Sequence, residues 1–278
     1  MSAILAKHRG MPAQDGAGVK LTRIINQPGL KHQDPFLMLD EFRSDNPDDY
    51  IAGFPSHPHR GFCTLTYMLA GTMEHKDSVG NTGAVEAGGV QWMKAAKGII
   101  HAEMPKQVEG LMWGFQLWVN LPSDEKMSEP DWHDFPSATI PEVKSDDALV
   151  RVISGQYQEQ EGPVRAPGRD FLMLDVHLGK EAFSLPSQGQ KRRLLYVYQG
   201  SLTVNGELAK EGELLVLDPA DTLTCTTDEG ARFILLAAKP IEEPIAQYGP
   251  FVMNNSGEIE QAIKDYQAGT LAANQKLS

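Results

Sequence analysis

Short runs of alternating apolar and polar residues recur along the chain, with glycines and prolines between them. Residues 62–69, 171–178, 193–198 and 232–238 each show the period of two that turns one face of a strand toward a core. The 26 glycines and 18 prolines are spread between such runs rather than gathered in one segment. Many short strands separated by turn residues predict an all-β architecture of the sandwich or barrel type.

The last thirty residues differ, because they carry a helical pattern. Asn255, followed three residues later by Glu258, resembles an N-terminal capping box, and Gly269 is suited to end the helix. Between them, apolar residues three or four positions apart form one stripe: Ile259, Ala262, Ile263 and Tyr266. We expect a short C-terminal α-helix that docks on a barrel through this stripe.

The strand pattern occurs twice. The segment YMLAG at 67–71 matches YVYQG at 196–200, and residues 88–92 parallel 211–215. A strand that enters a glycine turn and is followed by another apolar strand is therefore present in both halves.

This repeat predicts two tandem β-barrel domains. Residues 131–148 interrupt both periodicities and form the predicted linker. We expect one domain at 1–135 and the other at 136–278, with the helix at the end of the second domain. A length of 278 residues is consistent with two domains.

Charge and apolar runs exclude some classes of protein. Lys and Arg total 25 and Asp and Glu total 37, so the net charge of −12 disfavours direct binding of nucleic acid. No run approaches the roughly 20 apolar residues of a membrane helix, and the N-terminus does not have the pattern of a signal peptide. The two cysteines, Cys63 and Cys225, do not make a disulfide framework. We expect a cytoplasmic protein without membrane contacts.

Four residues in the first half have the chemistry and spacing of metal ligands. His57 and His59 are two apart, and so are His101 and Glu103. Residues two apart on a strand point to the same face, so neighbouring antiparallel strands could bring both pairs to one ion. Burying three imidazoles and a carboxylate without a partner costs several kcal/mol, which favours a metal site over core packing.

The ligand types restrict the metal. Three imidazoles and one carboxylate suit Fe, Mn, Co, Ni, Cu or Zn, and they do not suit Ca or Mg. We expect one divalent transition metal per chain, with Fe(II) as the first choice. Four protein ligands leave two positions of a six-coordinate ion open for a substrate and O2.

The second half does not repeat these ligands. Counting from the turn glycines, His57 and His59 correspond to Pro186 and Gln188. In the same way, His101 and Glu103 correspond to Thr224 and Thr226. The second domain is therefore predicted to lack a metal and to serve a structural or pocket-capping role.

Two other groups of residues are not expected to bind a metal. His75 lies in the polar run EHKD and is expected to be solvated, as is His177. The four tryptophans all precede the linker: Trp92, Trp113, Trp118 and Trp132. We expect most of them to be core residues, with the lining of a pocket as the alternative for one or two.

The repeated barrels resemble the cupin superfamily, and longer motifs resemble the pirin family. These motifs are GFPSHPHRGF at 53–62, GIIHAEMP at 98–105 and GPFVMN at 249–254. The resemblance implies a bicupin, that is, two jelly-roll barrels with one iron in the N-terminal cupin held by His57, His59, His101 and Glu103. Pirin-like sequences usually have a glutamate where Cys63 stands, so ligation by Cys63 is an alternative.

The resemblance also implies a function. Several pirins are dioxygenases that act on flavonols such as quercetin. Under this hypothesis the substrates are a flavonol and O2, Glu103 is the general base for the flavonol 3-hydroxyl, and ring opening releases a depside and carbon monoxide. One alternative is a redox-sensitive iron-binding regulatory protein that acts through protein partners, as eukaryotic pirins do. Another is that a different small phenolic compound is the substrate.

Overall fold

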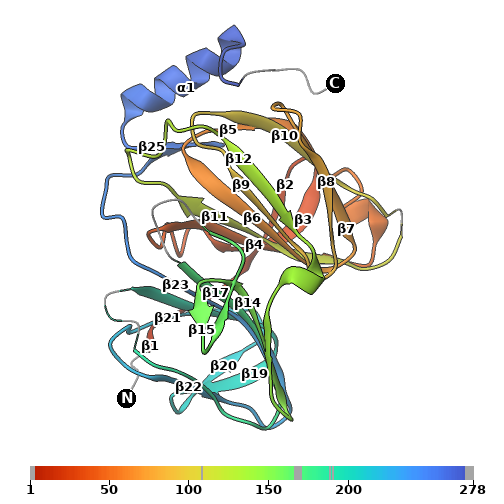
Figure 1. Ribbon diagram of the computed structural model, residues 1–278, viewed down its shortest axis with the longest axis vertical. Coiled ribbons are helices and arrows are strands. Elements are labelled where there is room, and N and C mark those ends of the chain that lie inside the picture. The colour runs from red at the N-terminus through yellow and green to blue at the C-terminus, as the bar shows by residue number, and fades with distance from the viewer. Residues whose placement is uncertain (1–3, 108, 166–170, 188, 190, 273–278) are drawn as a thin grey trace. The chain divides into compact units, whose positions relative to one another are not determined.

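The computed structural model describes residues 4–107, 109–165, 171–187, 189 and 191–272 (Figure 1). These residues form two compact units. The first unit comprises Pro12–Asn26, Phe36–Ser137 and Ile241–Ser278, and the second comprises Met1–Met11, Gln27–Pro35 and Ala138–Pro240. Both are built from strands, with a single α-helix in the described residues, as the alternating pattern predicted.

The first unit contains a larger sheet, a smaller sheet and a C-terminal hairpin. The larger sheet has the order β12 (Asp131–Phe135), β9 (Val90–Lys94), β6 (Phe62–Ala70), β11 (Met112–Asn120), β4 (Phe36–Ser44), β3 (Val19–Ile25), β2 (Met11–Asp15). The smaller sheet has the order β5 (Phe54–His59), β10 (Ile99–Pro105), β7 (Thr72–Asp77), β8 (Thr82–Glu86). The hairpin pairs β24 (Ala246–Tyr248) with β25 (Phe251–Met253), and a 3-10 turn, η1, spans Pro47–Asp49.

The second unit is built on the same plan. Its main sheet has the order β1 (Ile4–Arg9), β21 (Glu213–Leu217), β19 (Arg192–Val204), β23 (Ala231–Ala238), β17 (Phe171–Leu178), β14 (Ala148–Ser154), β13 (Glu142–Lys144). Three shorter strands join it through β19: β18 (Phe183–Leu185), β20 (Glu207–Lys210) and β22 (Leu223–Thr226). A hairpin of β15 (Gln156–Tyr157) and β16 (Gln160–Glu161) and a 3-10 turn, η2 (Ser137–Thr139), complete the elements.

Strand order confirms the internal repeat. The order β9-β6-β11-β4 in the first unit has the same form as β21-β19-β23-β17 in the second. Tyr67 pairs with Val90 in the first, and Tyr196 pairs with Leu214 in the second. The turn residues Gly71 and Gly200 both have positive φ, of 83° and 77°, which glycine adopts without steric cost.

The same register corrects the ligand positions expected in the second half. Gly88, rather than Gly89, is the counterpart of Gly212, and the segments between the turn glycines and the ligand strands also differ in length between the two units. Each position counted from the sequence therefore lies one residue from the true counterpart. Because side chains alternate along a strand, one residue exchanges the inward and outward faces. The register of β18 with β22 makes Leu185 and Leu223 the counterparts of His57 and His101.

These counterparts are buried hydrocarbon side chains. Leu185, Leu223 and Cys225, the last equivalent to Glu103, belong to the hydrophobic core of the second unit. Of the four positions counted from the sequence, Gln188 lies outside the described residues. Apolar packing therefore fills the second barrel where the first barrel carries polar side chains.

The chain termini depart from the expected domain boundaries. The switch between units at Ser137 and Ala138 lies close to the expected boundary at 135/136, but β1 pairs with β21 in the second unit, and residues from Ile241 onward belong to the first. The cause is packing, because β25 runs beside the turn that follows β5. A Cβ on Gly61 in that turn would lie 1.9 Å from the Val252 carbonyl oxygen.

The terminal helix has the ends that the sequence predicted, on a different unit. α1 spans Ser256–Ala268; the Asn255 side chain accepts a hydrogen bond from the Glu258 backbone N–H, and Gly269 takes the left-handed conformation. Ile259 and Ala262 pack with Phe251 and Ile100 of the first unit, beside β25 (Figure 1). Within the described residues, no helix has the length and apolar character needed to cross a membrane.

Candidate metal centre and pocket

Three of the four predicted ligands meet on the smaller sheet of the first unit. β5 and β10 are antiparallel neighbours, and His57 lies directly opposite His101. His59 projects to the same side as His57 because it is two residues further along the strand. One ring nitrogen from each of His57, His59 and His101 lies within 4.8 Å of the others, the arrangement of a group that can hold a metal ion.

The Nε2 atoms of His57 and His59 face each other, and His57 is held by a backbone carbonyl. His57 Nδ1 is 2.9 Å from the Pro55 carbonyl oxygen, and His57 Nε2 is 3.0 Å from His59 Nε2. His101 Nε2 is buried and has no hydrogen-bond partner. A buried imidazole nitrogen without a partner is costly, and coordination of a metal would satisfy it, so the residues fit a transition metal.

Burial also keeps two of these imidazoles, His59 and His101, neutral. His101 is fully buried, and this burial, together with the neighbouring imidazoles, holds its pKa well below the ordinary value. Burial and the adjacent His57 lower the pKa of His59 in the same way. Neutral imidazole is the form that binds metals, so both rings are ready to coordinate near neutral pH.

Glu103 lies beside this group but outside it. Its carboxylate accepts a hydrogen bond of 2.9 Å from the Thr66 hydroxyl and one of 3.5 Å from Gln116 Nε2. Both donors belong to the larger sheet, on β6 and β11, so Glu103 bridges the two sheets of the unit. Among the described residues, the group that could hold a metal ion consists of the three histidines. Ligation by Glu103 therefore stays a prediction.

Thr66 and Gln116 belong to a row of polar side chains that crosses the larger sheet. In this polar row each residue lies directly opposite the next on the neighbouring strand: Arg23, Asp40, Gln116, Thr66, Gln91 and Asp134. Cross-strand partners share a face, so the polar row follows one side of the sheet. Sequence patterning missed it because its members come from six different strands, and only the strand register brings them side by side.

Arg23 and Asp40 form the ion pair at one end of the polar row. Arg23 Nε and Nη2 donate to the two Asp40 oxygens at 3.0 and 2.8 Å. Burial raises the pKa of the Asp40 carboxyl to about 6, although the Arg23 guanidinium opposes this rise. The pair therefore holds two charges in a largely dehydrated environment, where a bidentate geometry is most favourable.

A cavity of about 650 Å³ lies against the histidine group. Its walls combine polar and apolar side chains of the first unit. The polar ones include His57, His59, Glu103, Gln116, Thr66, Arg23 and Asp40; the apolar ones include Leu21, Met38, Phe42, Phe54, Met73 and Trp118. Small-molecule sites commonly enclose about 300–1,000 Å³ with mostly apolar walls and a few polar groups, and this cavity fits that description.

Trp118 is the tryptophan that lines the pocket. Its ring meets the His59 ring edge-on, with the centroids 5.2 Å apart, and packs on Phe62 at 4.3 Å. Trp92 and Trp113 are buried in the unit, as expected for core residues.

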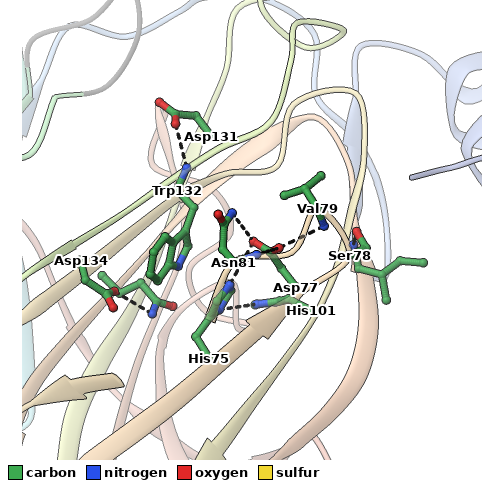
Figure 2. A network of polar contacts seen from close by, with 11 residues as sticks. His75, Asp77, Ser78, Val79, Asn81, His101, Asp131, Trp132 and Asp134 are labelled. Atoms are coloured by element: carbon green, nitrogen blue, oxygen red, sulfur yellow. Dashed lines mark hydrogen bonds and ion pairs between the residues drawn. The ribbon is translucent and has the colours of Figure 1, made fainter. Parts of the chain in front are cut away.

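The prediction that His75 is exposed to solvent is wrong. His75 is 2% exposed, its Nδ1 lies 3.4 Å from His101 Nδ1, and its Nε2 lies 3.3 Å from Asp77 Oδ2. Figure 2 shows His75 between His101 and Asp77, with the Trp132 ring stacked against it at 5.4 Å. His177 is also not free, because its Nε2 lies 3.0 Å from Asp175 Oδ2.

Asp77 is held in turn by the loop that follows β7. Its oxygens accept from the backbone N–H groups of Val79 and Asn81 and from the Asn81 side chain. Burial alone would raise the pKa of Asp77, but the hydrogen bonds from His75 and Asn81 together hold it below the usual value.

Cys63 does not join the histidine group among the described residues. It is buried on β6, and burial raises the pKa of its thiol. A thiol that resists deprotonation is a poor metal ligand, because the thiolate is the binding form.

Comparison with known proteins agrees with the fold. A family model described as Pirin matches residues 18–119, and one described as Pirin C-terminal cupin domain matches residues 173–272. A Pseudomonas aeruginosa protein provisionally named a quercetin 2,3-dioxygenase is 51% identical over 280 residues, covering 97% of this chain and 98% of the relative. A pirin-like protein of Caulobacter vibrioides is 44% identical, covering 94% and 96%.

A solved structure has the same architecture. The crystal structure of quercetin 2,3-dioxygenase from Acinetobacter baumannii superposes with a TM-score of 0.91 at 29% identity, covering 99% of this chain and all of that one. The two tandem cupin domains predicted from the repeat are thereby confirmed. With both family models matched in sequence order, the chain belongs to the pirin family.

Proposed function

We propose that the protein is a metal-dependent dioxygenase that cleaves flavonols such as quercetin. The observation that carries this proposal is the pocket, which joins His57, His59 and Glu103 to apolar walls in one cavity of about 650 Å³. The names of the Pseudomonas and Acinetobacter relatives point to the same reaction.

The metal in this proposal is one divalent transition ion, with Fe(II) as our choice and Mn, Co, Ni, Cu or Zn as alternatives. His57, His59 and His101 would hold it, with Glu103 as the fourth ligand. When bound, it would supply Lewis acidity toward a phenolic oxygen and, as Fe(II), redox chemistry with O2.

The chain's own residues would then manage the proton and the substrate. Glu103 is the proposed base for the flavonol 3-hydroxyl, and Thr66 and Gln116 hold its carboxylate in place. The apolar walls, including Trp118 and Phe54, would bind the flat rings and exclude water. Both atoms of O2 enter the opened product, a depside, and one ring carbon leaves as carbon monoxide.

The pocket favours this reading over a purely regulatory role. A redox-sensitive regulator that acts through protein partners needs a metal, but it has no use for a cavity of about 650 Å³ beside that metal. Another small phenolic compound would use the same residues, so the substrate must be tested directly.

Consumption of O2 and release of carbon monoxide with quercetin test the proposal. The iron-loaded protein is expected to do both, and Glu103→Gln to be slower by at least about 100-fold because the base is lost. His101→Ala should lose both metal and turnover, whereas His133→Ala, at an exposed histidine outside the pocket, is the matched control. Equal turnover in the wild type and in Glu103→Gln and His101→Ala would refute the assignment.

A further inference from the structure

We propose that His75 and Asp77 are positioning residues that fix the proton of His101 on Nδ1 and so leave Nε2 free to bind the metal. The three residues form one continuous line of contacts from the metal site to the loop after β7 (Figure 2). The proposal concerns which ring nitrogen carries the proton, a property that every metal-binding histidine must have set correctly.

The direction of these hydrogen bonds, from donor to acceptor, follows from Asp77. Its Oδ1 accepts from the backbone N–H groups of Val79 at 3.0 Å and Asn81 at 2.9 Å, and its Oδ2 accepts from Asn81 Nδ2 at 2.8 Å. A carboxylate surrounded by donors can only accept, so the proton in the contact with His75 must sit on His75 Nε2.

The second contact is then determined. The proposal takes His75 as an imidazole with a single proton, which Nε2 holds against Asp77, so His75 Nδ1 is the acceptor. The atom that faces it is His101 Nδ1, which must therefore carry the proton. His101 Nε2 is left unprotonated, and this is the buried nitrogen that has no hydrogen-bond partner.

Strand geometry explains why this line exists. β10 lies between β5 and β7, with His101 opposite His57 on one side and opposite Asp77 on the other. His75 is two residues before Asp77 and so points to the same face. The Trp132 ring stacked on His75, with 19° between the planes, restricts the orientation of the His75 ring.

The other two ligand histidines do not have such a chain. His57 Nδ1 faces a backbone carbonyl, the Pro55 oxygen, which can only accept and needs no further residue to set the proton. His101 faces an imidazole, which can either donate or accept. A second residue, Asp77, is therefore required to settle the direction.

Asp77→Asn tests the direction of these hydrogen bonds while keeping the shape of the side chain. The amide oxygen would take the place of Oδ1 against the two backbone N–H groups, and its NH2 group would then face His75 Nε2. We expect His75 to move its proton to Nδ1 and His101 to move its proton to Nε2, where it blocks coordination. His75→Phe keeps a ring against Trp132 but removes both contacts.

Two measurements use no substrate. Nitrogen-15 NMR of histidine-labelled, metal-free protein, with His101→Ala for assignment, should find the His101 proton on Nδ1 in the wild type and on Nε2 in Asp77→Asn. Zn(II) affinity, by competition with a chromophoric chelator, should fall about 10- to 100-fold in Asp77→Asn and His75→Phe. His177→Phe is the control, since His177 also contacts an aspartate two residues away on a strand, in the second unit.

The wild-type spectrum alone can overturn the proposal, if the His101 proton is found on Nε2. So can Asp77→Asn with wild-type Zn(II) affinity, or an equal loss of affinity in His177→Phe. The inference rests on the metal centre of the proposed function but not on its substrate. Failure to cleave quercetin would leave both measurements unaffected, so the two proposals can fail separately.

Discussion

At the scale of single residues, the site depends on imidazoles that stay neutral while buried. His59 and His101 have lowered pKa values because burial disfavours the charged ring. Near neutral pH this costs nothing, since the unfolded chain also carries mostly neutral histidines. On acidification, however, the folded and unfolded chains respond differently.

We expect the metal-free protein to lose stability as the pH falls below about 6.5, the ordinary histidine pKa. Below this value the unfolded chain takes up protons at His59 and His101 that the folded chain cannot accept, so unfolding becomes easier. Each residue contributes at most about 1.4 kcal/mol per pH unit. Urea unfolding with a chelator at pH 7 and 5.5 measures this, and His101→Phe should reduce the pH dependence; an unchanged dependence would contradict the assignment.

Thr66 tests the placement of Glu103. Thr66→Val keeps the volume and shape of the side chain but removes the hydroxyl that donates to Glu103 Oε1. We expect kcat/KM with quercetin to fall about 10-fold with little loss of bound metal, because the carboxylate is less well oriented. Thr64→Val, on the same face of β6 but not in the pocket lining, should have no such effect. Equal losses in both variants would show that only packing is affected.

At the scale of strands, the predicted metal ligands could be found from the sequence, but the residues that contact and orient them could not. His57 with His59 and His101 with Glu103 could be found because charged or polar residues two apart, within apolar surroundings, indicate an inward face. His75 and Asp77 follow the same spacing, but their neighbours Glu74 and Lys76 are exposed and polar. Polarity on both faces hides which face is buried.

The ligand positions of the second barrel show a different limit. Similar motifs located the corresponding strands, but the segments between the turn glycines and these strands differ in length between the two units. Each counted position was therefore one residue out and lay on the opposite face. Only the strand register makes Leu185 and Leu223 the inward residues. Motif similarity therefore predicts which strands correspond more reliably than which side chains do.

The ion pair at the end of the polar row gives a prediction at this scale. Arg23→Met leaves the Asp40 carboxylate buried without its cation, so we expect the free energy of unfolding to fall by about 3–5 kcal/mol. The double variant Arg23→Met/Asp40→Leu removes both charges and should be more stable than the single variant. Urea unfolding of the two variants and the wild type checks this, and a double variant less stable than Arg23→Met would contradict it.

At the scale of the whole molecule, the two cupin domains share a strand order but differ in what fills them. The first carries the histidine group, and the second has packed leucines at the corresponding positions. We expect protein purified without added metal to contain about one transition-metal ion per chain, in agreement with one site. Elemental analysis with a protein assay measures the ratio; two ions per chain would contradict the filling of the second barrel.

The last prediction concerns the C-terminal segment, which packs with the first unit. Residues after Pro240 follow the second cupin in sequence, yet Val252 packs with Leu37 and Phe62 of the first unit. Lys126 Nζ donates to both the Val252 and Gly61 carbonyl oxygens, 3.0 and 2.7 Å away, and so ties β25 to the turn after His59.

Truncation after Pro240 should therefore damage the first unit although it removes the end of the chain. Loss of β24, β25 and α1 uncovers the apolar residues around Ile100 and leaves the turn after His59 unsupported, so Zn(II) affinity should fall at least about 10-fold. Hydrogen exchange should become faster in residues 54–62 and 99–105, while residues 171–178 keep their protection. If protection were lost from 171–178 instead, the helix would belong with the second cupin, as its place in the sequence suggests.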